Sequence, residues 1–63
     1  MLTIPQTMKA LENALGGDTL TDEQIHAAMR WSIDLRGQEI GQCLADRLNL
    51  WIARVERAEA ETA

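Results

Sequence analysis

The second half of the chain carries an uninterrupted pattern of helical spacing. Apolar or small residues occur at positions 37, 40, 41, 44, 48, 51, 55 and 58. This spacing puts them on one face of an α-helix and predicts a continuous buried stripe. Pro, the residue that interrupts helices most strongly, is absent after position 5. The remainder of the chain is expected to serve as a short partner for this long helix.

Two segments have the form of a capping box. The first runs from Thr3 to Gln6, with Pro5 in the first helical turn, and predicts a helix over 4–15. Gly16-Gly17 is predicted to end that helix, because glycine accepts the left-handed conformation common at a helix C-terminus. After a turn over 16–21, the second box, Thr21 to Gln24, starts another helix at residue 22. The chain is therefore predicted to be an all-α helical hairpin.

The second helix has two possible extents. Its apolar residues stay in phase across Gly37, which favours one unbroken helix over 22–58 with a frayed tail over 59–63. Gly37 and Gly41 each lower helix stability by roughly 1 kcal/mol relative to Ala, so a three-helix domain broken at Gly37 is the alternative. The residues predicted to share the stripe are Ile25, Met29, Ile33, Ile40, Leu44, Trp51 and Val55.

A single small domain of 63 residues is marginally stable by itself. The lone Cys43 excludes an intramolecular disulfide, so oligomerisation is the remaining way to enlarge the core. An unbroken second helix would run for roughly 58 Å, about three times the length of the first. A second copy is therefore predicted to cover it, giving an antiparallel four-helix bundle. The predicted dimer core is Ile40, Leu44, Leu48, Trp51 and Val55.

Trp31 and Leu35 point away from the stripe in the unbroken helix. Trp and Arg are enriched in binding hot spots, so these two residues predict an exposed patch for a partner protein. Its polar rim is formed by Arg30, Asp34 and Gln38. The alternative is that Trp31 packs in the core, which a break at Gly37 would favour.

Gly37, Gly41 and Ala45 are spaced four apart and line a shallow groove on the helix. The favoured interpretation is close approach by a neighbouring helix, and a slot for a foreign side chain is the alternative.

The sequence predicts neither catalysis nor a cofactor or metal site. His26 follows Asp22 by four residues, but two ligands do not complete a metal site. Ser32, the one serine, has no positioned base, and Cys43 is expected to act as a small apolar residue. We therefore expect a protein that is not an enzyme.

The net charge of −4, from ten acidic and six basic residues, disfavours direct nucleic-acid binding. The sequence shows no secretion signal and no membrane-spanning run, so a cytoplasmic location is expected. The predicted function is that of a homodimeric regulator that captures a cytoplasmic protein, as an inhibitor, anti-activator, adaptor or assembly chaperone. A basic DNA-binding partner, masked by this acidic chain, would fit that function.

The alternative function is a small dimeric transcriptional regulator or antitoxin that presents the helix over 38–54 to DNA. A strip of arginines free of carboxylates would be needed for it, formed by Arg30, Arg36, Arg47 and Arg54.

Overall fold

The computed structural model describes residues 2–62, and its first helix begins at a complete capping box. Helix α1 spans Ile4–Leu15, the bounds that the sequence pattern predicts. The Thr3 hydroxyl accepts from the Gln6 amide at 3.2 Å, and the Gln6 side chain accepts from the Thr3 amide at 2.9 Å. These two bonds satisfy amides that would otherwise lack partners in the first turn. The chain leaves α1 through Gly17, whose φ of 127° suits glycine.

Helix α2 (Asp22–Asp34) starts in the same way and ends much earlier than the sequence pattern predicts. Thr21 and Gln24 repeat the capping box, with distances of 3.2 and 2.9 Å. The helix then gives way to a turn in which Gly37 has a φ of 92°. The amide of Gln38 donates to the Leu35 carbonyl at 3.0 Å and closes the turn. The predicted unbroken helix over 22–58 is therefore wrong, and the three-helix alternative is correct.

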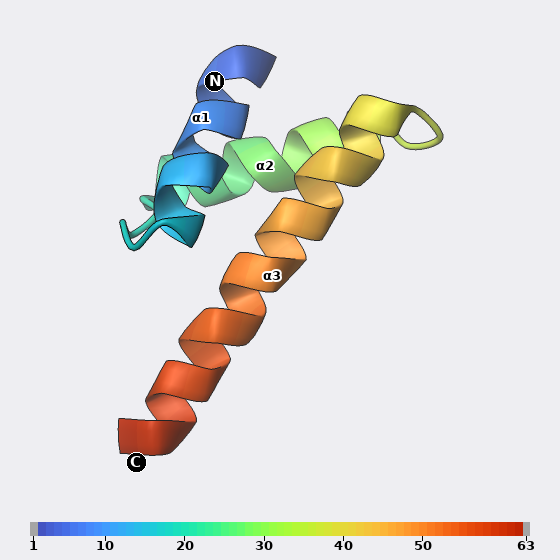
Figure 1. The fold of residues 1–63 in the computed structure, drawn as a ribbon. Coiled ribbons are helices and arrows are strands. Elements are labelled where there is room, and N and C mark those ends of the chain that lie inside the picture. Colours follow the sequence, from blue (N-terminus) through green and yellow to red (C-terminus); the bar gives the residue numbers. More distant parts are fainter. Residues whose placement is uncertain (1, 63) are drawn as a thin grey trace.

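Helix α3 (Glu39–Thr62) is the longest of the three and continues through the segment predicted to fray. Residues 59–62 of the tail that the sequence predicted to fray are helical, and residue 63 lies outside the described residues. Figure 1 shows α1 and α2 lying beside the first half of α3, while its second half runs past both of them. The all-α class is confirmed, since residues 2–62 contain three helices and no strand.

The core lies where the three helices meet. Its buried side chains come from all of them: Leu11 of α1, Ala28 of α2, and Leu44 and Leu48 of α3. Five half-buried apolar residues surround this centre: Met8, Leu20, Trp31, Leu35 and Trp51. The turn at Gly37 explains this arrangement, because it folds α3 back over the hairpin and lets its apolar face pack within one chain.

Gly41 allows α3 to approach the end of α2 closely. A Cβ atom at this position would lie 2.7 Å from the carbonyl carbon of Leu35 and 2.9 Å from its Cβ atom. Both distances are shorter than real Cβ contacts, so only glycine fits here without a shift of the backbone. The predicted helix groove of Gly37, Gly41 and Ala45 does not form, because Gly37 lies in the turn before α3. At Gly41 the close approach comes from Leu35, at the end of α2 in the same chain.

Candidate interaction surfaces

Trp31 is part of the folded body. Its indole Nε1–H donates to the backbone carbonyl of Leu2 at 2.8 Å, and its ring packs against the core from α2. A half-buried Trp commonly pairs its indole N–H in this way, since an unpaired buried donor is costly. The prediction that Trp31 stands clear of the core is wrong, and the core-packing alternative describes it. The break at Gly37 is the physical reason, because it turns this face of α2 toward the other helices.

The other members of the predicted patch divide between core and surface. Leu35 is half-buried and packs against the core, so it does not stand clear of it either. Arg30 and Asp34 are exposed and form an ion pair in which the Nε to Oδ2 distance is 3.1 Å. Gln38 is exposed in the turn before α3. The polar rim is thus on the surface, although the apolar centre predicted for it is not.

Two large apolar side chains that the sequence pattern assigned to the buried stripe lie on the surface of α2 instead. Met29 is 48% exposed and Ile33 is 60% exposed, and they are one helical turn apart. Ile25, one turn before Met29, is half-buried. Once α2 ends at Asp34, its stripe no longer has to continue that of α3, and the packed face of α2 becomes the one with Ala27 and Ala28. The short side chains at 27 and 28 are the signal that could have identified this face.

The predicted dimer core is mostly the core of the single chain. Leu44 is fully buried and Leu48 nearly so, both against residues of α1 and α2. The prediction that these two need a second chain to cover them is wrong, because the turn at Gly37 supplies the cover from within. Ile40 is exposed at the start of α3, and Trp51 and Val55 are half-buried further along it.

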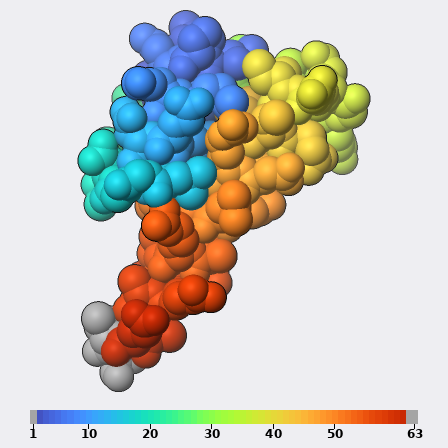
Figure 2. Space-filling model, viewed as in Figure 1, coloured from blue at the N-terminus to red at the C-terminus, as the bar shows by residue number. Residues whose placement is uncertain are grey.

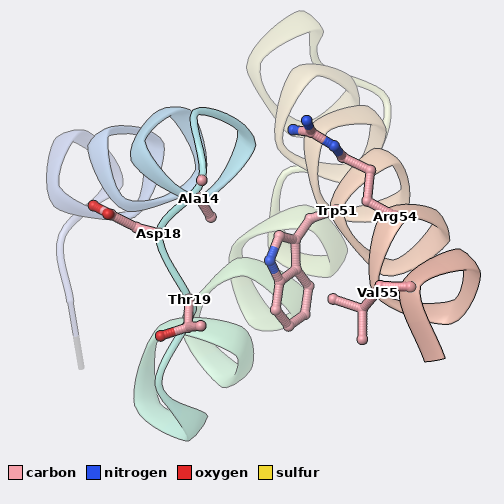
Figure 3. Close-up of a pocket in the computed structure, with 8 residues that line it drawn as sticks. Ala14, Asp18, Thr19, Trp51, Arg54 and Val55 are labelled. Atoms are coloured by element: carbon pink, nitrogen blue, oxygen red, sulfur yellow. The ribbon is translucent and has the colours of Figure 1, made fainter. Parts of the chain in front are cut away.

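A groove of about 290 Å³ separates the end of α1 from the middle of α3. Figure 3 shows the Trp51 ring in this groove, with Val55 beside it and Ala14 and Thr19 opposite. The Arg54 guanidinium donates to the carbonyl of Leu15, the last residue of α1. A cation at a helix C-terminus is favourable, because the helix dipole leaves partial negative charge there. Arg54 therefore links α3 to the end of α1 by a hydrogen bond along one side of the groove.

The outward face of α3 carries one isolated large apolar side chain. Leu50 is 58% exposed and lies with Asp46, Asn49 and Ala53 along a shallow hollow. Its neighbours on this face are polar or small, so Leu50 is an ordinary exposed leucine without an extended apolar patch around it. This makes it a suitable control position for experiments on other surfaces.

Two of the four arginines in the strip that DNA binding would need are bound within the chain. Arg30 is paired with Asp34, and Arg54 is bound to the end of α1. On the first turns of α3, Glu39 is exposed and Gln42 donates to Asp46 at 2.8 Å. Carboxylates at the exposed start of this helix would face phosphates unfavourably, which weighs against the DNA-binding alternative.

The possible metal ligands and nucleophiles considered above lie on α2 and α3. Within residues 2–62 no group of three or more His, Cys, Asp or Glu side chains is placed to hold a metal ion. The hydroxyl of Ser32 donates to the Met29 carbonyl at 2.8 Å, and Cys43 is half-buried. No helix in this part of the chain combines the length and apolar character needed to cross a membrane.

Comparison with protein families, with characterised proteins and with solved structures yields no match to this chain. The function is therefore inferred from the surfaces described above.

Proposed function

We propose that this chain is a small homodimeric protein-binding regulator, without enzymatic activity, that docks the outer face of α2 onto a partner protein. The observation that supports it is the pair Met29 and Ile33, two large and strongly exposed apolar side chains one helical turn apart. Helix faces of this kind bind by laying residues at such spacing into an apolar groove. The proposal keeps the polar rim predicted from the sequence and replaces its apolar centre.

The charged and apolar residues on the outer face of α2 indicate which kind of surface a partner would present to it. Asp22 lies two turns before Met29 on the same side of α2, and it is exposed in the first turn of the helix. Beyond Met29 and Ile33, the Arg30–Asp34 pair forms part of the polar edge. With a net charge of −4, the chain would be attracted to a partner whose apolar groove is rimmed by Lys and Arg. Binding of this kind would mask a basic surface, as an inhibitor or anti-activator does.

Burial of these two side chains in a partner's groove would contribute a large share of the binding free energy. Burying a large aliphatic side chain contributes about 1.5–3 kcal/mol, so removal of one such anchor should weaken binding by roughly 10- to 100-fold. Both residues already lie on a folded helix, so docking would require no ordering of the backbone of α2.

A pair of matched substitutions tests this proposal. Ile33→Ser and Leu50→Ser each remove one large exposed aliphatic side chain, from α2 and from the outward face of α3 respectively. Neither should change stability by more than about 0.5 kcal/mol, since both sites are exposed. The immobilised wild-type chain, Leu50→Ser and Ile33→Ser are compared in capture from the native cell extract and then against the purified partner by calorimetry. We expect the first two to bind alike and Ile33→Ser to bind roughly 10- to 100-fold more weakly; equal binding by all three would refute the role of α2.

A further inference from the structure

We propose that the exposed second half of α3 pairs with the same segment of a second copy of this chain, in antiparallel orientation. This segment, residues 51–62, is called the α3 arm below. The inference rests on the homodimer in the proposed function and specifies its surface, its orientation and its register. It does not involve the outer face of α2, so the two proposals can fail separately.

The arm begins beside the end of α1, where Trp51 and Arg54 contact the chain, and then extends beyond the body formed by α1, α2 and the first half of α3. A helix of 24 residues is about 36 Å long, and the longest dimension of the molecule is 36 Å. The second half of α3 thus accounts for much of the elongated shape. Figure 2 shows it as an orange-to-red projection below the rest of the chain. Most helical stability in proteins comes from packing of an apolar face, so packing of the arm against another element would stabilise it.

The face of the arm that continues the core is apolar. Trp51, Val55 and Ala58 follow the buried Leu44 and Leu48 at alternating spacings of three or four residues, which places all five on one side of α3. The same side is therefore packed against the chain itself at its start, and further along it faces the groove beside the end of α1. Trp51 and Val55 are half-buried beside the groove, and Ala58 is exposed.

The body determines the orientation of the second copy. A parallel partner would have to lie along the same face at Leu44 and Leu48, which α1 and α2 already occupy. An antiparallel partner avoids them, because its body lies beyond the end of the first arm. Seam residues of antiparallel helices then form layers in which Val55 meets the partner's Ala58. In this register the end of each arm reaches Trp51 of the other copy, at the groove beside Gly17 and Thr19.

The charges flanking the seam fit this register. Arg54 and Glu61 lie on the same flank, seven residues apart, and in antiparallel helices each flank meets its own counterpart. With Val55 opposite the partner's Ala58, Arg54 lies opposite the partner's Glu61. The guanidinium has five N–H donors, so its bond to Leu15 leaves others for a carboxylate. Glu61 lies near a helix C-terminus, where the dipole disfavours a carboxylate, and a cation from the second copy would offset this.

The proposed contact between the two arms is short, so we expect the dimer to be weak. Twelve residues of helix overlap over about 18 Å, so the interface falls below the roughly 1,200 Å² of stable complexes. We therefore expect a reversible dimer with a dissociation constant in the micromolar range, on the order of 10 μM.

Sedimentation equilibrium of the full chain and two charge-reversed variants tests the register. Glu61→Arg places like charges opposite each other at two symmetric sites, and it should raise the dissociation constant about tenfold. Glu56→Arg makes the same change of charge on the same helix away from the seam, and should raise it less than about twofold. Circular dichroism checks that both variants keep their helix content. A monomer at all concentrations up to about 1 mM, or equal weakening by both variants, would overturn the proposal.

Disulfide trapping tests the orientation. In a Cys43→Ala background, Val55→Cys and Ala58→Cys chains carrying different tags are mixed and oxidised. Antiparallel pairing predicts mixed disulfides between the two variants, because facing seam Cβ atoms approach to about 4 Å. Preferential Val55→Cys homodimers would indicate parallel pairing or an antiparallel register centred on residue 55, and either would overturn the inference. Ile33→Ser should dimerise as the wild type does, so loss of partner capture by that variant bears only on the proposed function.

Discussion

Gly41 of α3 packs directly on the backbone of Leu35, the residue that caps α2. A Cβ atom on Gly41 would overlap the Leu35 carbonyl group, whose carbon would be only 2.7 Å away. This contact fixes how closely α3 folds back after the turn. It therefore decides whether Leu44 can reach the centre of the core, three residues further along the same helix.

Gly41→Ala is expected to destabilise the chain even though Ala is the better helix former. Ala gains roughly 1 kcal/mol of helix propensity over Gly, but the overlap with Leu35 involves backbone atoms that a rotamer change does not move. We expect a net loss of about 1–3 kcal/mol in the free energy of unfolding. Urea denaturation followed by circular dichroism measures it.

Gly16→Ala is the matched control for that experiment. Gly16 caps α1 with a φ of −84°, and an added Cβ atom would come no closer than 3.4 Å to the Asn13 carbonyl. Its free energy of unfolding should stay within about 0.5 kcal/mol of the wild type. If Gly41→Ala proved as stable as Gly16→Ala, the close approach of α3 to Leu35 would be contradicted.

Local signals in the sequence predicted the parts of the fold that depend on local contacts. Both capping boxes form as expected, and α1 has the predicted bounds, because each box needs only residues three apart. The end of α2 was missed because the apolar stripe remains in phase across Gly37. Folding back there is favoured by contacts of Leu44 with Leu11 and Ala28, which are far away in the sequence.

The predicted patch around Trp31 was also wrong because it depends on contacts between residues far apart in the sequence. Trp31 was predicted to be exposed because it points away from the apolar stripe of an unbroken helix. Its hydrogen-bond partner is the carbonyl of Leu2, 29 residues away, so no helical periodicity could reveal it. Met29 and Ile33 were placed in the stripe because their spacing keeps them in phase with the apolar residues of an unbroken helix. Once α2 is packed through Ala27 and Ala28, they lie on the surface.

Trp31→Phe should isolate the contribution of the indole hydrogen bond. The substitution keeps an aromatic ring against the core and removes the donor to Leu2. We expect a loss of about 1 kcal/mol in the free energy of unfolding, the typical net contribution of one hydrogen bond. Hydrogen exchange should also quicken at the Thr7 amide, which donates to the Thr3 carbonyl in the first turn of α1. An unchanged exchange rate there would mean that Trp31 does not hold the start of α1.

Thr21→Ala should weaken α2 at its first turn. The hydroxyl of Thr21 accepts from the Gln24 amide at 3.2 Å, and its removal leaves that amide without its cap. N-cap threonines contribute about 1 kcal/mol, and thermal unfolding should reveal a loss of this size. Thr19→Ala is the control, since Thr19 is an exposed residue of the loop before the cap. Equal destabilisation by the two substitutions would show that the loop, and not the cap, is responsible.

Arg54→Ala should loosen the contact between α3 and the end of α1. The guanidinium donates to Leu15, and its charge lies where the dipole of α1 is negative. Because this arginine is exposed, we expect a modest loss of about 0.5–1 kcal/mol in the free energy of unfolding, measured well below the dissociation constant proposed for the dimer. Arg57→Ala removes an equal charge from the exposed arm one turn later, and should change the same free energy by less than about 0.5 kcal/mol.

Measurements at different salt concentrations distinguish the charge–dipole interaction of Arg54 from its hydrogen bond to Leu15. The interaction of its charge with the helix dipole is screened as ionic strength rises, whereas the geometry of the hydrogen bond is not. The difference between Arg54→Ala and the wild type should therefore shrink between 0.05 and 1 M NaCl, by up to about half, without vanishing. Arg54→Lys keeps the charge but has a shorter reach, so it should fall between the two at low salt. A loss for Arg54→Ala that is no larger than for Arg57→Ala would mean that α1 and α3 are held together by the core alone.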